Sequence, residues 1–403
     1  MTSSMRVCLV LETYWPQVGG GESAGRLLAR GLAERGHDVQ VFTRHSVAGV
    51  PLTEREGGIT IHRLPPAGRG AGKKWWLVPP MLAALASVAV TFDVVVVLGF
   101  RVLGVPAVLA GRWYDRPVIL KAESRGEASG AFFDAGLQRL GLSRESRLAR
   151  TGLRLRDRVL AGASGWVAMS TDLADEFLAS GVPAGRIHRI PNPIDTEVFR
   201  PPSSSERSEI RRRLDLDPVA PTVLYAGRFV EYKGILDIAE AWPAVLARRP
   251  DARLVFLGEG GTDIAACAGE LHRRVEELGL KDSVRIEPPV SDVAPWLMAA
   301  DVFALPTRDE AFGLAAAEAM ACGLAVVATS VGGLADFVRD GDNALTVAPS
   351  DPVGLATAIL EAIDSDRFRP GLRAQARATI VRQFDTGRVL DAWETLFQHA
   401  VRA

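Results

Sequence analysis

The chain of 403 residues is too long for one ordinary hydrophobic core and long enough for two domains of roughly 180 to 200 residues each. Apolar residues make up 48% of the chain and charged residues 24%, and the formal net charge is -1. This balance is typical of a soluble globular protein, and it excludes a disordered chain and predicts no nucleic acid partner.

The first half alternates short β-branched runs with helical patterns. The expected elements are the strand Arg6–Leu11, a helix near Glu22–Arg35, the strand Val39–Thr43, a helix near Met81–Val90, and the strands Val94–Leu98 and Val118–Lys121. The second half repeats this with the strand Thr222–Ala226, a helix near Ile235–Ala247, the strand Arg253–Leu257, a helix near Thr262–Leu278, and the strands Val284–Glu287, Val302–Leu305 and Leu324–Thr329. Such alternation predicts two α/β domains, each built on a doubly wound parallel sheet.

The passage from Pro191 to Pro202 is rich in proline and serine and has little periodicity, which is typical of a connection between domains. We therefore predict a first domain of residues 1–195 and a second of residues 203–384. Ligands of doubly wound sheets lie at the carboxyl ends of the strands, so the chemistry should come from the loops that follow them.

The most apolar stretch runs from Trp75 to Leu98, but Pro79-Pro80 and Asp93 interrupt it. Such residues are poorly tolerated in a membrane span, so we predict a buried helix followed by a strand. The pattern of the first residues predicts no secretory signal, and the three scattered cysteines indicate neither a disulfide framework nor a zinc site. A cytoplasmic location fits both observations.

Residues 144–158 depart from the alternation of strands and helices, since they contain six arginines and several leucines. A basic amphipathic helix of this kind can lie on an anionic membrane surface or contact an anionic acceptor. A solvated helix face is the commoner explanation of such a pattern. Peripheral contact with the inner face of the membrane stays open at this point.

The strongest local signal is EAFGLAAAEAMACG, from Glu310 to Gly323, between two expected strands. Its helix should begin near Gly313, and a helix start presents unpaired N–H groups and a positive dipole end that suit a phosphate. Glu310 before the helix and Glu318 inside it can accept hydrogen bonds from hydroxyl groups. A ligand with both diphosphate and polyol groups would use all of these parts, although glutamates near a helix start are also ordinary capping residues.

A second signal, YAGRFVEYKG, follows the strand Thr222–Ala226. Its two glycines allow close approach of the backbone to a ligand, and Arg228 and Lys233 bring two positive charges to one turn. The pattern predicts a diphosphate clamp; solubilising surface residues are the alternative.

A third signal, Gly19-Gly20-Gly21, opens the first helix but does not match G-x-G-x-x-G, because Ala24 occupies the place of the last glycine. A nicotinamide dinucleotide site is therefore disfavoured. The D-x-D at Asp215 and Asp217 lies far from the expected site loops, and the six histidines show no ligand spacing, so we predict no metal site.

Taken together, these segments resemble glycosyltransferase family 4, retaining enzymes of the GT-B fold in which two Rossmann-like domains face a central cleft. The resemblance spans most of the chain. It rests on the glycine-rich first turn and on the segments HRIPNPIDTEVFRP, GRFVEYKG, LGEGG, EAFGLAAAEAMACG and TSVGGLADFVRDGDNALTV. Residues 385–403 resemble the closing helix of that family, which packs back on the first domain.

The resemblance implies transfer of a hexose from a nucleotide-diphosphate sugar to a hydroxyl of a glycan, lipid-linked or small-molecule acceptor, without a metal or other cofactor. The catalytic residues it implies are Glu310, Arg228 and Lys233. The donor-binding residues it implies are Gly20, Gly258, Glu287, Phe312, Gly313, Leu314 and Glu318. By that resemblance Glu310 would meet the sugar, Glu318 the ribose, and Arg285–Val290 the base. The diphosphate would be held by Arg228, Lys233 and the backbone N–H groups of Phe312, Gly313 and Leu314, and Gly20 of the first domain would approach the same phosphates.

The chain departs from many relatives of that family at one position. Where they place a histidine near the reacting sugar, this chain has the run KAESRG, so Glu123 or Ser124 would serve on the acceptor side. A nucleotide-sugar epimerase or hydrolase of the same fold, or a non-catalytic nucleotide-sugar-binding subunit, remains an alternative, since a fold does not by itself fix the reaction.

Overall fold

The computed structural model describes residues 4–68, 73–139, 141–260, 265–364 and 370–402. Contacts between Cα atoms divide the chain into two units. Unit 1 is Met1–Pro193 with Thr386–Ala403, and unit 2 is Ile194–Asp385. The division falls inside the Pro- and Ser-rich passage after Pro191.

Unit 1 is built on an eight-stranded sheet with the order β3-β4-β2-β1-β5-β6-β7-β8. The strands are β1 Arg6–Leu11, β2 Asp38–Arg44, β3 Thr53–Glu56, β4 Ile59–Leu64, β5 Val94–Leu98, β6 Val118–Lys121, β7 Gly165–Ala168 and β8 Ile187–Arg189. All neighbours run parallel except β3 and β4. The central strands are buried on both faces, as expected where helices cover a parallel sheet.

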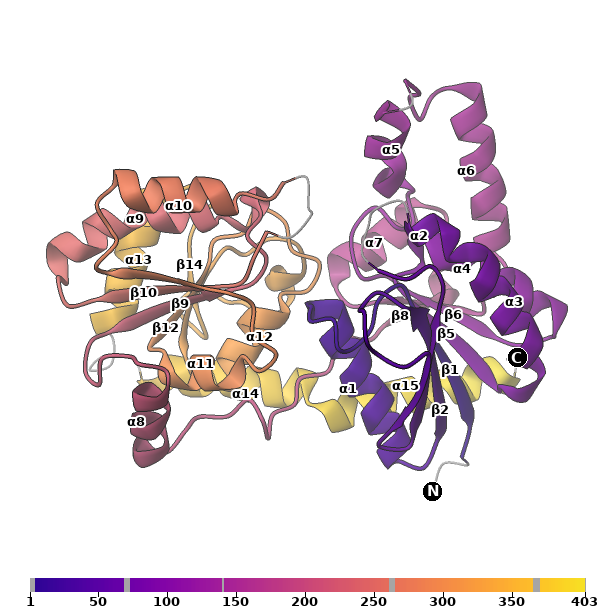
Figure 1. Cartoon of the computed structure of the whole chain (residues 1–403), viewed down its shortest axis with the longest axis horizontal. Helices are drawn as coiled ribbons and strands as arrows, with labels where there is room; N and C mark the ends of the chain where they lie inside the picture. Colours follow the sequence, from indigo (N-terminus) through magenta and orange to yellow (C-terminus); the bar gives the residue numbers. More distant parts are fainter. Residues whose placement is uncertain (1–3, 69–72, 140, 261–264, 365–369, 403) are drawn as a thin grey trace. The chain divides into compact units, whose positions relative to one another are not determined.

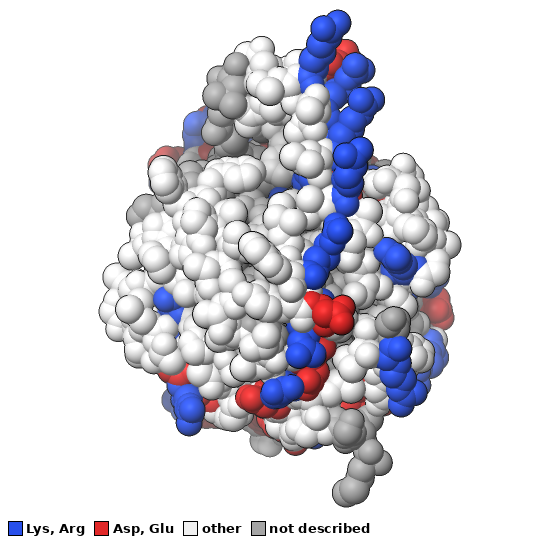
Figure 2. Space-filling view, turned by 90° about the vertical axis from the view of Figure 1, so that its right-hand side faces the viewer, with Lys and Arg blue, Asp and Glu red and all other residues white. Residues whose placement is uncertain are grey.

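The helices of unit 1 are α1 Gly20–Glu34, α2 Lys73–Trp76, α3 Val78–Val88, α4 Phe100–Trp113, α5 Asp134–Arg139, α6 Arg147–Leu160, α7 Thr171–Ala179 and α15 Thr386–Arg402. Figure 1 shows α5 and α6 extending beyond the sheet of this unit. Basic side chains form a row on the face seen in Figure 2, along this projection.

The C-terminal helix α15 belongs to unit 1, where it lies beside α1 (Figure 1). Leu390 of α15 packs against Gly31 of α1. An ideal Cβ on that glycine would lie 2.5 Å from Leu390 Cδ1, so a side chain there would push the two helices apart. His37 Nε2 lies 2.9 Å from Glu394 Oε1, and Arg35 donates to the same carboxylate. Trp393 is fully buried in the core that α15 shares with β1 and β5. Helix α15 therefore packs within unit 1.

Unit 2 is built on a six-stranded parallel sheet with the order β11-β10-β9-β12-β13-β14. The strands are β9 Thr222–Ala226, β10 Arg253–Leu257, β11 Val284–Glu287, β12 Val302–Leu305, β13 Ala325–Ala328 and β14 Leu345–Thr346. The helices are α8 Ser204–Arg213, α9 Ile235–Arg248, α10 Ala268–Glu277, α11 Ala294–Ala299, α12 Leu314–Ala321, α13 Pro352–Asp364 and α14 Pro370–Phe384.

The predicted fold class is confirmed, and most predicted strands have the observed bounds. Two expectations need correction. The helix of the apolar stretch buries only Met81 and Leu85 of its residues, so it is a surface helix rather than a buried one. The helix predicted near Thr262–Leu278 begins at Ala268 in the structure, while residues 262–264 lie outside the described part of the chain. None of the described helices has the length and hydropathy that crossing a bilayer requires.

Candidate active site

The strand order of unit 2 brings four strand ends together, at Glu287, Leu257, Ala226 and Leu305. We call these ends and the loops after them the carboxyl edge of unit 2. All but one of the residues predicted for donor binding and catalysis in this half of the chain lie on those loops or in the helix that follows β12. The exception is Glu287, which is the last residue of β11 itself.

The turns after β9 and β10 touch through their backbones. Gly258 has φ 147, and an ideal Cβ on it would lie 1.9 Å from the carbonyl oxygen of Gly227. Any side chain at Gly258 would therefore push the two turns apart. The predicted donor residue Gly258 thus has a structural reason to be glycine that is independent of a ligand. Gly261, the last residue of the predicted LGEGG turn, lies outside the described residues.

The loop after β12 is hydrogen-bonded to the turn after β9. The Arg308 N–H donates to the carbonyl oxygen of Tyr232 at 2.7 Å, and the Thr307 hydroxyl donates to the same oxygen at 3.1 Å. Gly234 has φ 71, and an ideal Cβ there would lie 2.1 Å from the carbonyl oxygen of Pro306. These contacts hold the two loops in one fixed arrangement.

The two loops bring Lys233 and Glu310 into direct contact. Lys233 Nζ lies 2.6 Å from Glu310 Oε2, and the two side chains are only 14% and 16% exposed. The structure therefore pairs the residue predicted for the diphosphate with the residue predicted for the sugar. A ligand whose phosphate and hydroxyl groups are close together could meet both partners of this pair.

Arg228 lies on the same edge and is exposed. Its guanidinium stands 5.8 Å from the centre of the Tyr232 ring and donates to the Tyr232 hydroxyl. Tyr232 therefore orients the arginine and also supplies the backbone carbonyl that fixes the β12 loop. Sequence reasoning did not single out Tyr232, although it lies between the two predicted cations.

Helix α12 begins as predicted. Gly313 is its N-terminal cap with φ 99, and no side chain of the described residues caps the helix. An ideal Cβ on Gly313 would lie 2.3 Å from Leu334 Cδ2, so a glycine is required at this point. The first-turn N–H groups can therefore meet an external anion.

Glu318 lies in the second turn of α12 and is half-buried. Burial raises the pKa of its carboxyl to about 8. This glutamate is therefore mostly protonated near neutral pH in the absence of a ligand, and it can both donate and accept a hydrogen bond.

Glu287 ends β11, where its carboxylate pairs with Arg285 two residues earlier. The Arg285 guanidinium stands 5.3 Å from the Trp296 ring and donates to the carbonyl oxygen of Leu214. The carbonyl oxygen of Glu287 accepts from the Gly258 N–H at 3.0 Å. The backbone of Glu287 is thus placed at the carboxyl edge, while its side chain has an internal partner.

The carboxyl edge of unit 1 is formed by the ends of β1, β5 and β6, at Leu11, Leu98 and Lys121. Gly20 opens α1 just after this edge. The Thr13 hydroxyl donates to Glu22 Oε1 at 2.5 Å, and burial raises the pKa of Glu22. An ideal Cβ on Gly19 would lie 2.3 Å from Glu22 Oε2, so α1 already has a carboxylate over its start. The contact of Gly20 with donor phosphates stays a prediction.

The two predicted acceptor-side residues, Glu123 and Ser124, lie on this edge. Glu123 forms an ion pair with Lys121, which is only 3% exposed. The backbone N–H groups of Glu123 and Ser124 and the Ser124 hydroxyl all donate to Glu127 Oε1 at 3.1 Å. Burial raises the pKa of Glu127. Sequence reasoning missed Lys121 and Glu127 because their burial and partners depend on the folded sheet.

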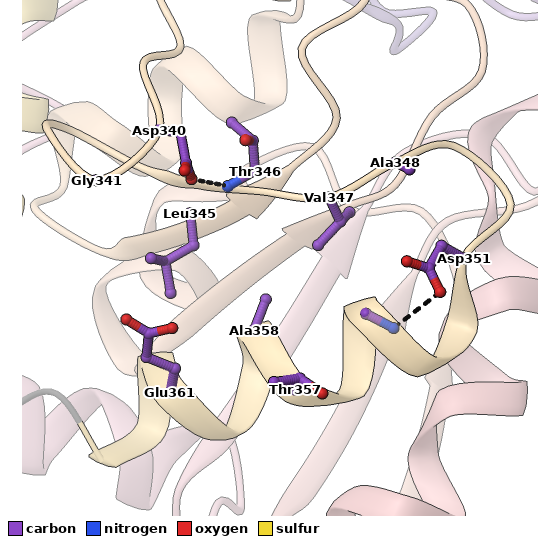
Figure 3. A pocket seen from close by; sticks show the side chains of 11 residues that line it. Asp340, Gly341, Leu345, Thr346, Val347, Ala348, Asp351, Thr357, Ala358 and Glu361 are labelled. Carbon is purple, nitrogen blue, oxygen red and sulfur yellow. Dashed lines mark hydrogen bonds between the residues drawn. The ribbon is translucent and has the colours of Figure 1, made fainter.

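A hollow lies elsewhere in unit 2, between the segment around β14 and helix α13 (Figure 3). None of the predicted site residues lines it. Two of its carboxylates have structural roles, because Asp340 accepts from the Thr346 N–H at 2.7 Å and Asp351 accepts from the Gly354 N–H at 2.9 Å. We assign this hollow no part in the site.

Among the described residues, no three side chains of His, Cys, Asp or Glu come together in a way that could hold a metal ion. Asp217 of the D-x-D accepts from the N–H groups of Val219 and Ala220 instead, as a turn residue does. Arg228 and Lys233, the cations predicted to hold the diphosphate, both lie on the carboxyl edge of unit 2.

The two doubly wound α/β units of the chain match the GT-B fold of glycosyltransferases. Residues 19–193 match the model of the glycosyl transferase 4-like domain, and residues 220–365 match the model of glycosyl transferases group 1. The chain belongs to glycosyltransferase family 4 and is a retaining glycosyltransferase.

Two of the most similar curated relatives are named D-inositol 3-phosphate glycosyltransferase. That of Xylanimonas cellulosilytica is 31% identical over 90% of this chain and 88% of its own length. That of Catenulispora acidiphila, named D-inositol 3-phosphate glycosyltransferase 1, is 31% identical over 91% of this chain and 89% of its own length.

Solved structures show the same fold at lower identity. Sucrose-phosphate synthase from Thermosynechococcus elongatus has a TM-score of 0.81 and 22% identity, and the match covers 98% of both chains. Anabaena HepE, solved in complex with UDP and glucose, has a TM-score of 0.76 and 21% identity, covering 96% of this chain and 97% of its own.

Proposed function

We propose that the chain takes a hexose from a nucleoside-diphosphate sugar bound at the carboxyl edge of unit 2 and transfers it to an acceptor hydroxyl without a metal ion. The observation that supports this most directly is the Lys233–Glu310 pair at 2.6 Å beside the start of α12. It places a cation, a carboxylate and free N–H groups within one small region. A sugar diphosphate presents the phosphate and hydroxyl groups that complement all three.

The roles of the residues follow from where charge develops. As the bond between sugar and phosphate breaks, negative charge grows on the leaving diphosphate. Arg228, Lys233 and the N–H groups of the α12 start would stabilise that charge more strongly in the transition state than in the ground state. Glu310 would accept hydrogen bonds from sugar hydroxyls, and Glu318 would bind the ribose.

Retention of configuration needs no enzyme nucleophile in this scheme. The acceptor would attack from the face that the diphosphate leaves, and a phosphate oxygen would take the acceptor's proton. The new bond joins the acceptor oxygen to the anomeric carbon, and the nucleoside diphosphate departs with the bonding electron pair. The relatives named above act on D-inositol 3-phosphate by their names. For this chain the proposed acceptor class remains a glycan, a lipid-linked molecule or a small molecule.

A thermal-shift screen of nucleotide sugars tests the donor site, because a ligand that binds only the folded chain raises its melting temperature. Product analysis with donor alone and with acceptor then separates transfer from the epimerase and hydrolase alternatives. An altered or hydrolysed sugar as the only product, with or without acceptor, would contradict the transferase proposal.

Metal independence is tested separately with EDTA. Activity should persist after chelation, since fixed cations take the place of a metal at the diphosphate. Complete loss in EDTA that Mg²⁺ or Mn²⁺ restores would reject this part of the proposal.

We also propose that the chain acts in the cytoplasm and that α6 makes peripheral contact with an anionic membrane surface. Four arginines of α6 are exposed and recur at spacings of three and four residues, so they lie on one stripe of the helix: Arg147, Arg150, Arg154 and Arg158. Beside that stripe Leu148 and Leu155 are 72% and 61% exposed. Basic and apolar stripes side by side are typical of helices that lie in a membrane interface.

The other two arginines of this segment bind unit 1 itself. Arg144 pairs with Asp134 at 3.2 Å, and the Arg156 guanidinium donates to the carbonyl oxygen of Ala128. Arg144 and Arg156 therefore hold the segment of α5 and α6 against the rest of unit 1, and they do not belong to the exposed stripe.

The membrane proposal is tested by replacing Arg147, Arg150 and Arg154 with glutamine. Each arginine near an anionic surface contributes about 1 kcal/mol, so the triple variant should bind phosphatidylglycerol-containing vesicles at least tenfold more weakly. The matched control replaces three exposed arginines of unit 2 by glutamine: Arg212, Arg213 and Arg248. Equal vesicle binding by the parent and the α6 variant would show that these arginines form a solvated helix face and do not bind the membrane.

A further inference from the structure

The side chain of Arg308 joins separate segments of unit 2 at its carboxyl edge. Arg308 lies on the loop after β12, two positions before Glu310. Its Nη1 donates to the carbonyl oxygen of Glu231 at 2.9 Å, and its Nε donates to the Ser350 hydroxyl at 2.6 Å. Its Nη2 donates to Asp237 and lies 3.0 and 3.1 Å from the two carboxylate oxygens. Every nitrogen of the guanidinium therefore has a partner within the unit.

The partners of Arg308 lie on both sides of Lys233 along the chain. The carbonyl of Glu231 belongs to the short helical turn that ends at Lys233, and Asp237 lies in the first turn of α9. The backbone N–H of Arg308 adds a further contact to this segment, because it donates to the carbonyl oxygen of Tyr232 at 2.7 Å. One residue of the β12 loop thus holds the chain two residues before, directly before and four residues after Lys233.

The ion pair with Asp237 anchors the guanidinium, because one of the two partners is buried. The side chain of Asp237 is 9% exposed, whereas that of Arg308 is 34% exposed. Burial raises the pKa of Asp237, and the positive charge of Arg308 acts against this rise. Ser350, which lies between β14 and α13, contacts the guanidinium from another segment. These contacts restrict the rotation of the arginine side chain.

The ammonium group of Lys233 contacts the same loop. Its Nζ lies 2.6 Å from Glu310 Oε2 and 3.5 Å from the carbonyl oxygen of Asp309. Arg308 therefore holds the backbone around Lys233, while the next two residues of the loop hold its charged end. The alignment of such a group is critical, since a misplacement of about 1 Å at a reacting centre can lower the rate about a hundredfold.

We propose that Arg308 is a positioning residue of the transfer, which holds Lys233 against Glu310 in the geometry that the leaving diphosphate requires. The inference rests on the proposed function, since Arg308 is assigned no contact with the substrate and acts only through Lys233. A guanidinium suits this role because its N–H groups point in fixed directions to several partners at once. The ammonium of a lysine, at the end of a flexible stem, cannot reproduce that fork.

Steady-state kinetics of Arg308→Ala, with the donor found in the thermal-shift screen, tests the role. The value of kcat should fall about tenfold or more while the donor KM changes less than about threefold, because the misaligned cation matters most as charge develops on the diphosphate. Arg308→Lys keeps a positive charge near Asp237 but loses the fork, so its kcat should stay close to that of the alanine variant. Parental kcat in either variant would overturn the proposal.

A double variant shows whether Arg308 acts through Lys233. Residues that act as one unit have non-additive effects, so Arg308→Ala should lower kcat less than about threefold in a chain that already carries Lys233→Ala. A further loss in the double variant as large as the loss in Arg308→Ala alone would overturn the proposed route.

Arg249→Ala is the matched control. Arg249 also joins separate segments of unit 2, through ion pairs with Asp251 at 3.1 Å and Asp364 at 2.9 Å, and its side chain is 30% exposed. It lies just before β10, at the opposite edge of the sheet. The control should keep parental kcat, and both single variants should melt within a few degrees of each other. An equal loss of kcat in Arg249→Ala and Arg308→Ala would assign the effect to general destabilisation and overturn the proposal.

The failure of this inference can be distinguished from the failure of the proposed function. A chain that no nucleotide sugar stabilises, or a Lys233→Ala variant with parental kcat, would contradict the proposed donor site and the inference with it. A large loss of kcat in Lys233→Ala together with parental kcat in Arg308→Ala would overturn the inference alone.

Discussion

The carboxyl edges of the two units come from the same kind of sheet but present different side chains and different helix starts. In unit 2 the edge presents Arg228, the Lys233–Glu310 pair and the uncapped start of α12. In unit 1 the corresponding edge presents the carboxylates of Glu22 and Glu123, and α1 begins beneath one of them. The doubly wound sheet fixes where a ligand can approach, and the loop side chains decide which charge that ligand can have.

The difference has a chemical reason. A leaving diphosphate is an anion whose charge grows during the reaction, so the edge proposed to bind the donor needs fixed cations and N–H groups. An acceptor hydroxyl is a neutral donor, so carboxylates suffice to orient it. Unit 1 also depends on a distant part of the chain, because Trp393 of α15 lines the cavity beside Lys121 and Glu123.

The largest expected effect tests this dependence. Trp393→Ala removes a fully buried indole from the core of unit 1 and should cost about 3–5 kcal/mol of unfolding free energy. Urea unfolding followed by circular dichroism measures the loss. The control Trp76→Ala removes an indole that is 74% exposed and should change stability little. Equal losses in both variants would show that α15 does not support the edge.

The next effect separates transition-state from ground-state roles on the donor edge. Arg228→Ala and Lys233→Ala should each lower kcat about a hundredfold, or about 3 kcal/mol, because their partner gains charge only as the bond breaks. Glu310→Ala should also lower kcat, through a misplaced sugar. Glu318→Ala should mainly raise the donor KM, since a ribose contact exists before and during cleavage.

Steady-state kinetics on these four variants gives the measurement, after melting curves show that each folds like the parent. Lys281→Ala is the control, since that exposed lysine pairs with Glu276 away from the edge. If Arg228→Ala and Lys233→Ala keep near-normal kcat with every donor that the parent uses, the cationic edge does not hold the diphosphate.

A smaller effect appears in the dependence of stability on pH. The pKa of Glu318 is about 8 in the folded chain against an ordinary 4.5, so the folded state binds the proton more tightly than the unfolded state. This contribution to stability is complete below pH 4.5 and is lost as pH rises to about 8. Glu318→Gln should therefore gain stability relative to the parent over this range, by a few kcal/mol at most.

Melting temperatures of both proteins between pH 5 and pH 9 give the comparison. The difference should grow with pH and become constant above about pH 8. A difference that does not vary with pH would place the Glu318 carboxyl in a solvated environment.

The smallest effect tests how closely Glu123 approaches α1. Gly21→Ala should gain up to about 1 kcal/mol from helix propensity and lose part of it, because its Cβ would lie 3.3 Å from the Glu123 carboxylate. Gly152→Ala in α6 is the control, since a Cβ there meets nothing within 4 Å. The difference between the two stability changes measures the crowding. If both variants gain equally, Glu123 does not extend over the start of α1.

The sequence by itself determined the central strands, the two-domain architecture and the family, whereas β3, β4, β7, β8 and β14 were not predicted. Strands such as β1, β9 and β10 have the predicted bounds because buried parallel strands are short β-branched runs between turn residues, a signal local to the chain. The start of α12 at Leu314 was predictable for the same reason, since a glycine cap leaves a local mark.

The tertiary structure alone decided which of these residues meet. Lys233 and Glu310 are 77 positions apart, and only the neighbouring positions of β9 and β12 in the sheet bring them into contact. The buried Glu127, the ion pair of Lys121 and the placement of Trp393 beneath the unit 1 edge also leave no pattern in the sequence. Burial and pairing depend on contacts between distant segments, and the energy of a charge is set by those surroundings rather than by its neighbours in the chain.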